Sequence, residues 1–256
     1  MIKNKAKLKT NLYAILSIVT FFVIWSIIAY LQNAELILPK PSLVIKDFFV
    51  LFATKDFYLS VFYTFLRGIL AFFVSFVLAL TLSILGNFFK PLHAVLSPYI
   101  FIMRSVPTMS VILLIILWVN SFTSPILIAF LVIFPIQYSS FFGAINNIDK
   151  DLLQMAEVYK IDKKNIVRKI YLSMLLPQIL VAVKATIGLT VKVVIAGEVL
   201  AHTSASIGAM MQQAKIFIDT ANLLAWTVVA ILLSYFLESI ITLILKKLRK
   251  KYGYNN

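Results

Sequence analysis

The residues best suited to chemistry are ionisable side chains inside long apolar stretches. A charge at the centre of a bilayer costs roughly 3 kcal/mol or more, so each of these side chains must face protein or water. From the sequence alone two roles stay open: a structural ion pair, or contact with a solute that crosses the membrane. The candidates for a translocation pathway or gate are Arg104, Lys184, Lys192, Glu198, His202 and Glu238.

Lys184 and Glu238 lie at matched depths in two apolar stretches. Lys184 is about seven residues from the start of the stretch 178–200, and Glu238 is about seven residues from the end of the stretch 223–245. These two ends lie on the same side of the membrane in the topology below. With a rise of about 1.5 Å per residue, both would lie roughly 10 Å inside the membrane, which predicts an ion pair between them. Arg67 lies near one end of an earlier stretch, and we expect its long side chain to reach the membrane surface.

Catalytic and metal chemistry find no support in the residue types. The chain has no cysteine and 2 histidines, His93 and His202, which fall at opposite membrane faces in the topology below. The segments GNFFKP and GAINNIDK lack the spacing and the Lys-Ser/Thr pair of a phosphate-binding loop. We therefore expect no catalytic residue, no metal site and no cofactor in this chain, and ATP, if used, must bind elsewhere.

Composition identifies a membrane protein. Hydrophobic residues make up 61% of the chain and charged residues 13%, with a mean hydropathy of +0.96, which no water-soluble core requires. A net charge of +14 would suggest a nucleic-acid partner in a soluble protein. Here the basic residues cluster at the ends of apolar stretches, where they set orientation in the membrane, so we expect no nucleic acid.

The apolar stretches predict an all-α integral membrane protein with six transmembrane helices in a single transmembrane domain, residues 1–256. The first stretch is too long for a signal peptide and has no small-residue cleavage site, so we interpret it as an uncleaved span. Residues 37–54 predict an interfacial helix capped by Ser42. The predicted spans cover residues 12–31, 57–89, 96–118, 125–145, 178–200 and 223–245.

The distribution of lysine and arginine orients these spans. With six spans both termini lie on one side, together with the loop between the fourth and fifth spans. That side carries 16 of the 24 basic residues and the other side 4, with the rest inside spans. Because cytoplasmic segments are enriched in basic residues, we expect cytoplasmic termini and a cytoplasmic loop.

The cytoplasmic loop, residues 146–177, is the one long polar interval. Leu152, Met155, Ala156 and Tyr159 fall on one face of a predicted helix, and Asp162 is placed to cap a second amphipathic helix. Such a loop either folds back on the lipid surface or forms a docking surface for a soluble partner.

The loop resembles the EAA loop of ABC-importer permeases, whose pattern is Glu-Ala-Ala, three residues, Gly, nine residues and Ile-x-Leu-Pro. Ala156, Ile170 and Leu172 match this pattern, whereas Gln154, Lys160 and Ser173 replace its Glu, Gly and Pro. The likeness extends from about residue 37 to residue 245 through the segments ILPKPS, RSVPTMSVILLIILW and AGEVLAHTSASIG. The chain is similar to permeases of the nitrate/sulfonate/taurine branch.

The resemblance implies a type I ABC-importer permease fold in a prokaryotic plasma membrane, surrounded by lipid. It implies a homodimer, cytoplasmic ABC ATPase subunits that bind ATP and Mg, and an external solute-binding lipoprotein. The solute would be small, of the sulfonate, taurine or nitrate kind or a vitamin or pyrimidine precursor. The ATPase-coupling residues would be Leu152, Gln154, Met155, Ala156, Tyr159, Lys160, Ile161, Asp162, Ile170 and Leu172.

Two further expectations follow. Lysine is strained by roughly 1 kcal/mol in the left-handed conformation that glycine adopts freely, so we predict that the turn at Lys160 is not left-handed. The alternative function is an ion-coupled secondary transporter or channel that acts without an ATPase and uses Lys192, Glu198 and Glu238 as a relay. Inverted repeats with broken helices would favour it, and the sequence reveals none.

Overall fold

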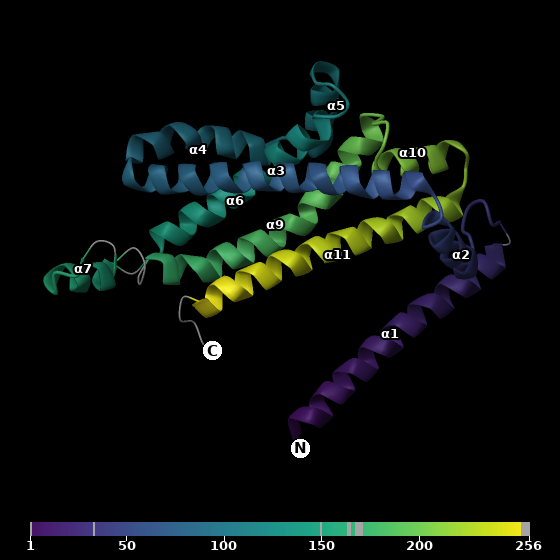
Figure 1. The fold of residues 1–256 in the computed structure, drawn as a ribbon, viewed down its shortest axis with the longest axis horizontal. Helices are drawn as coiled ribbons and strands as arrows, with labels where there is room; N and C mark the ends of the chain where they lie inside the picture. The colour runs from purple at the N-terminus through teal and green to yellow at the C-terminus, as the bar shows by residue number, and fades with distance from the viewer. Residues whose placement is uncertain (1, 33, 149, 163–164, 167–170, 252–256) are drawn as a thin grey trace. The chain divides into compact units, whose positions relative to one another are not determined.

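A computed structural model describes residues 2–32, 34–148, 150–162, 165–166 and 171–251, and these residues form helices and connecting turns without a β-strand. Figure 1 shows the elements in chain order. The helices are α1 (Ile2–Gln32), α2 (Pro41–Leu51), α3 (Lys55–Phe88), α4 (Lys90–Ser105), α5 (Thr108–Trp118), α6 (Ser124–Asn146), α7 (Lys150–Val158), α9 (Leu172–Leu200), α10 (Ile207–Ile216) and α11 (Thr220–Lys251).

Five of these helices are long and apolar enough to cross a membrane, or six spans if α4 and α5 together count as one. This confirms the all-helical membrane fold. The predicted third span, residues 96–118, is not one continuous helix. α4 and α5 meet at an angle of 100°, and Figure 1 shows α5 turning away from the direction of α4. The break falls at Pro107, which lacks an N–H group and drives Val106 into an extended conformation (φ −70°, ψ 131°).

Proline also marks where other helices begin. Pro41 and Pro125 lie in the first turns of α2 and α6, where their missing N–H groups cost nothing. Lys40 is the N-cap of α2 and makes no side-chain cap bond, so the expected cap by Ser42 is wrong. Pro135 and Pro177 lie inside α6 and α9, as membrane helices tolerate when neighbours satisfy the freed carbonyl groups.

The chain divides into two compact units. The first comprises residues 1–58 and 210–229. Within it Trp25 Nε1 donates to the carbonyl of Pro39 at 3.1 Å, and the ring of Phe57 lies 5.8 Å from that of Trp226. Most of the apolar residues of α1 are exposed, as expected of a helix that meets lipid.

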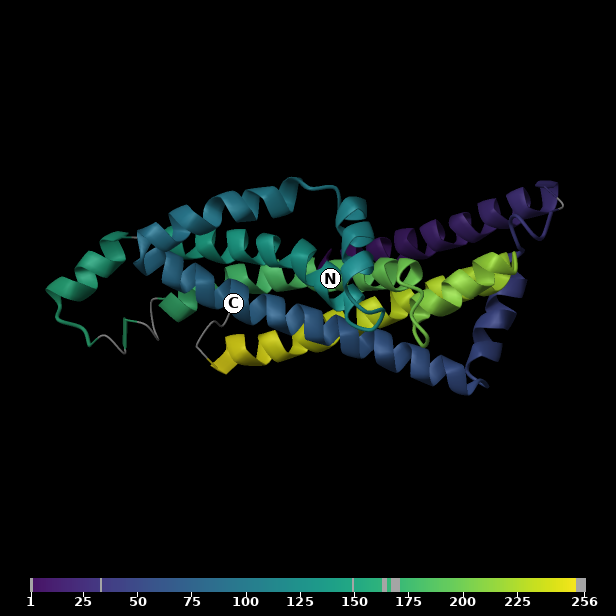
Figure 2. The same ribbon diagram turned by 90° about the horizontal axis from the view of Figure 1, so that it is seen from above.

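The second unit comprises residues 59–209 and 230–256, and its core lies between α6 and α9. The two helices run side by side in both views (Figures 1 and 2). A Cβ atom at Gly197 of α9 would lie 3.1 Å from Cα of Pro125, so glycine permits the close approach. Apolar residues of α3, α5, α6 and α9 form the main cluster: Ala71, Ile112, Ile115, Ile128, Ala129, Ile133, Val193 and Val194.

Among the residues that the structure describes, three helices are each followed, two positions after their last residue, by a non-glycine residue with positive φ. Lys160, His202 and Ile218 have φ values of 48°, 47° and 57°. In each case the following N–H returns to the carbonyl five residues back, as in a Schellman motif: Ile161 to Ala156 at 2.9 Å, Thr203 to Glu198 at 3.5 Å and Asp219 to Ala214 at 2.9 Å. The prediction that Lys160 avoids a left-handed turn is therefore wrong, because the bond that closes α7 offsets the strain.

Candidate functional site

A buried ion pair joins α3 and α9 in the second unit. Arg67 Nη1 lies 2.9 Å from Glu198 Oε1, and the two side chains are 3% and 0% exposed. The carboxylate also accepts bonds from Thr64 Oγ1 at 2.9 and 3.0 Å and from the Gly208 N–H at 3.2 Å. A buried charge that is paired and fully hydrogen-bonded avoids the penalty of isolation.

Arg67 does not reach the membrane surface, contrary to expectation. Its Nε donates to the carbonyl of Phe122 at 3.2 Å, and its guanidinium lies 4.9 Å from the centre of the Phe122 ring. The planar guanidinium thus satisfies several partners at once, which outweighs solvation at the interface. Of the two roles left open for Glu198, the structure therefore supports the structural ion pair.

The start of α10 is held against the same carboxylate. The Ile207 N–H donates to Thr64 Oγ1 at 2.9 Å, and Ser206 Oγ accepts the Ala209 N–H at 2.9 Å, as an N-cap does. A Cβ atom at Gly208 would lie 2.4 Å from Cβ of Glu198, so only glycine fits there. The segment AGEVLAHTSASIG therefore encodes this contact.

Lys184 and Glu238 do not form the predicted ion pair. Within the part of the chain that the structure describes, the ion pairs are Arg67–Glu198 and the exposed Lys40–Glu35. Lys184 and Glu238 are both exposed, so each side chain points away from the packing of its own chain. Equal depth in the membrane does not determine how each helix is rotated about its axis. In this structure the rotation of α9 and α11 leaves the two side chains unpaired.

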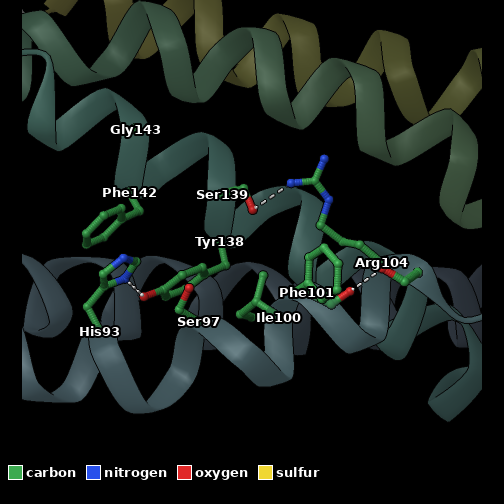
Figure 3. Close-up of a pocket in the computed structure, with 10 residues that line it drawn as sticks. His93, Ser97, Ile100, Phe101, Arg104, Tyr138, Ser139, Phe142 and Gly143 are labelled. Atoms are coloured by element: carbon green, nitrogen blue, oxygen red, sulfur yellow. Dashed lines mark hydrogen bonds between the residues drawn. The ribbon is translucent and has the colours of Figure 1, made fainter.

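A cavity of about 630 Å³ lies between α4 and α6 (Figure 3). His93 Nδ1 lies 2.9 Å from the Tyr138 hydroxyl, and its ring stacks on Phe142 at 3.8 Å. Arg104 Nη1 donates to Ser139 Oγ at 3.4 Å, as Figure 3 shows. The lining residues are His93, Ser97, Ile100, Phe101, Arg104, Ser105, Tyr138, Ser139, Phe142 and Gly143, and they include no carboxylate.

Sequence reasoning selected Arg104 but not its companions in this cavity. His93, Ser97, Ile100 and Arg104 follow one another at intervals of three and four residues, which places them on one face of α4. That spacing was the available signal. His202, by contrast, is exposed in the turn after α9, and Lys192 is exposed on α9 itself.

The end of α7 carries exposed apolar side chains outside the spans. Val158 and Tyr159 are 79% and 74% exposed, Met155 is 47% exposed and Ile161 is 39% exposed. We call these four residues the docking patch. Val158 was missed by sequence reasoning, although it follows Met155 by three positions, the spacing of one helix face.

The residues of the predicted apolar face do not share one environment. Met155 and Tyr159 are exposed, whereas Ala156 is fully buried within its own chain. Gln154, Lys160 and Asp162 are exposed, and the carbonyl of Asp162 accepts N–H bonds from Asn165 at 2.9 Å and Ile166 at 3.0 Å. Leu152 lies in α7 and Leu172 begins α9. Ile170 and most of the predicted second helix lie outside the described residues.

Apolar spans, a broken span, ionisable groups within spans and an exposed loop patch together define a polytopic membrane transport protein. Residues 77–251 match the family described as binding-protein-dependent transport system inner membrane component, and the chain belongs to this family. It is thus the permease subunit of an ABC importer, a multi-pass protein of the bacterial plasma membrane. The family decides against the alternative of a transporter that acts alone.

Relatives and solved structures agree with this assignment. The chain is 26% identical over 230 residues to a Bacillus subtilis (strain 168) protein described as an aliphatic sulfonates transport permease protein, SsuC, covering 89% of this chain and 83% of that one. It is 24% identical over 230 residues to the taurine transport system permease protein TauC of Escherichia coli (strain K12), with coverages of 87% and 83%. The fold is similar to a chain of the inward-facing MetNI methionine ABC transporter, with a TM-score of 0.62, 18% identity and coverages of 73% and 94%.

Proposed function

We propose that the chain, as a single permease domain of residues 1–256, pairs with a second copy of itself to form the pathway for a small anionic solute. Two cytoplasmic ATPase subunits, which bind ATP and Mg, dock on the loop of residues 146–177, and an external solute-binding protein delivers the solute. Closure of the ATPase pair moves α7 and exchanges inward-open for outward-open spans, with no covalent chemistry in this chain.

The docking patch is the observation that carries the proposal. Met155, Val158, Tyr159 and Ile161 expose apolar surface on a loop that the charge distribution assigns to the cytoplasm. Contiguous exposed apolar side chains on a soluble surface are typical of a protein-binding site. The left-handed turn at Lys160 returns the Ile161 N–H to the carbonyl of Ala156 at 2.9 Å, which places the backbone of Ile161 at the end of α7.

Two observations support an anionic solute. The relatives SsuC and TauC are named for aliphatic sulfonates and for taurine, both of which carry a sulfonate group. The cavity between α4 and α6 offers the Arg104 guanidinium, an imidazole and several hydroxyl groups with no carboxylate in its lining. A sulfonate-bearing solute with a short apolar tail matches these groups and the apolar side chains of Ile100 and Phe101.

The test of docking is a charge placed in the patch. Val158→Asp and Tyr159→Asp each insert a carboxylate into the contact without disturbing internal packing, because both side chains are exposed. Burying that carboxylate without a partner should abolish co-purification of the ATPase and ATP-driven uptake of a labelled alkanesulfonate. Asn165→Asp, an exposed position of the same loop outside the patch, is the matched control. Normal co-purification of the Val158 and Tyr159 variants would show that the patch faces lipid instead.

A further inference from the structure

Two lysines lie on one exposed face of α9. Lys184 and Lys192 are both exposed, although the segment Met174–Leu200 is apolar enough to span a membrane and more than half buried. Gly188 stands between them, four positions from each, so the three residues share one helix face. Val181, Ala185 and Ala196 are exposed beside them. We call the face formed by Lys184, Gly188 and Lys192 the lysine stripe.

The stripe lies near the middle of the span. Lys184 and Lys192 are three and five residues from the centre of Met174–Leu200, or roughly 5 and 8 Å along the axis. The hydrocarbon core extends about 15 Å to either side of its midplane, so a lysine side chain pointing along the helix falls short of water. Each ammonium group left in lipid would cost roughly 3 kcal/mol or more. The stripe must therefore face water or protein.

Neither lysine has a carboxylate partner among the described residues. The ion pairs there are Arg67–Glu198 and Lys40–Glu35. Glu198, on the same helix, is buried and already holds Arg67 and Thr64. Space in front of the stripe is also open, since a Cβ atom at Gly188 would meet no atom within 4 Å. Two uncompensated cations beside small residues form a surface that attracts an anion.

We propose that the lysine stripe lines the water-filled pathway and binds the anionic group of the solute midway across the membrane. The inference rests on the proposed function, because it requires that this chain form a solute pathway. It goes further in adding Lys184 and Lys192 to the Arg104 cavity as groups that bind the anion along the pathway. Two ammonium groups two helical turns apart can pass a sulfonate or carboxylate from one to the other as it crosses.

The absence of cysteine makes the stripe directly testable. Single-cysteine variants Ala185→Cys and Ala196→Cys place a thiol on the same face, and Ala182→Cys, on the same helix but buried, is the matched control. The full complex in membrane vesicles is treated with a sulfonate-bearing or a trimethylammonium-bearing methanethiosulfonate reagent. The thiolate fraction of a given variant is the same for both reagents, so the ratio of the two rates reports the local potential alone.

We expect the anionic reagent to react several-fold faster than the cationic one at Ala185→Cys and Ala196→Cys. The ratio should fall several-fold when Lys184→Gln and Lys192→Gln are added, and Ala182→Cys should stay unreactive. Failure of both reagents to reach the stripe thiols would place this face on lipid or beneath a second copy and overturn the proposal. Equal or faster labelling by the cationic reagent would overturn it too.

The outcome is separable from that of the proposed function. Labelling depends on access and potential and does not require ATPase docking. Anion-selective labelling together with normal ATPase binding by the Val158→Asp and Tyr159→Asp variants would support the role proposed for the lysine stripe and contradict the role proposed for the docking patch. Loss of ATPase binding in those variants without stripe labelling would reject the stripe alone.

Discussion

Arg67 and Glu198, 131 positions apart in the sequence, meet at 2.9 Å and are shielded from solvent together. Removing one partner leaves the other charge buried, so Arg67→Met or Glu198→Gln should each cost about 3–5 kcal/mol of stability. The double variant should cost much less than the sum, because it orphans no charge. Thermal unfolding of the detergent-solubilised protein measures all three.

The exposed pair Lys40–Glu35 is the control for this cycle, because its side chains are 50% and 57% exposed at a similar distance of 2.9 Å. Lys40→Met should change stability by less than about 1 kcal/mol. Additive losses in the Arg67 and Glu198 cycle would contradict the coupling.

Gly208 should tolerate no side chain. Gly208→Ala forces a Cβ atom against Glu198 and against the α9 backbone, with the carbonyl of Ile195 only 2.8 Å away. We expect a loss of stability of about 1–3 kcal/mol, the range for overpacked sites. Gly68→Ala, within α3, has open space around the new methyl group and should be neutral or stabilising by up to about 1 kcal/mol. Equal unfolding temperatures for the two variants would refute the close approach.

Lys160→Gly should stabilise the end of α7. Glycine adopts φ near 48° without strain, so the variant should gain about 1 kcal/mol in closing the turn. Slower hydrogen exchange at the Ile161 N–H, which bonds to Ala156, reports this gain. Ile218→Gly offers a comparison with a larger expected gain, since a β-branched residue suffers more at positive φ. Faster exchange at Ile161 in Lys160→Gly would mean that the turn at Lys160 is not left-handed in the membrane-embedded protein.

Asp47, in α2, should make stability depend on pH. Burial raises the pKa of its carboxyl group, and the nearby Asp219 charge raises it further, against the opposing effect of Lys46. Because the folded state holds this proton more tightly than the unfolded state, the contribution to stability is present at low pH and lost as pH rises through the raised pKa. Asp47→Asn should remove that dependence and raise stability modestly at neutral pH. An unchanged slope of unfolding temperature against pH would contradict this.

The sequence predicts the helices well because membrane spans can be recognised by the length and hydropathy of their apolar stretches. It does not predict the 100° angle after α4, since Pro107 marks a lost hydrogen bond but not the direction in which the chain continues. The Arg67–Glu198 contact depends on how two helices are rotated, which hydropathy does not encode. The same uncertainty explains the failed pairing of Lys184 with Glu238.

The candidate coupling surface was predicted in part. Helical spacing placed Met155, Ala156 and Tyr159 on one apolar face, and the structure exposes Met155 and Tyr159 but buries Ala156. A small residue on an amphipathic helix is compatible with either a contact to the partner or internal packing, and periodicity does not separate the two. The left-handed turn at Lys160 could not be predicted from intrinsic strain alone, because the helix-closing bond from Ile161 to Ala156 offsets that strain.

The buried contacts of Glu198, here called the clamp, hold one end of α9 in place, so any rigid rotation of this helix would pivot at that end. Thr64, Arg67 and Gly208 fix the helix near residue 198, whereas its other end continues from the loop that bears α7. If ATPase closure pulls on that loop, as we propose, α9 and the α6 helix packed against it would turn about the clamp, and each residue of α9 would travel in proportion to its distance from Glu198. Lys184, fourteen positions away, would sweep more than twice as far as Lys192, six positions away. The two ammonium groups would thus move by different amounts, and the distance of each from a bound anion would change during the same turn.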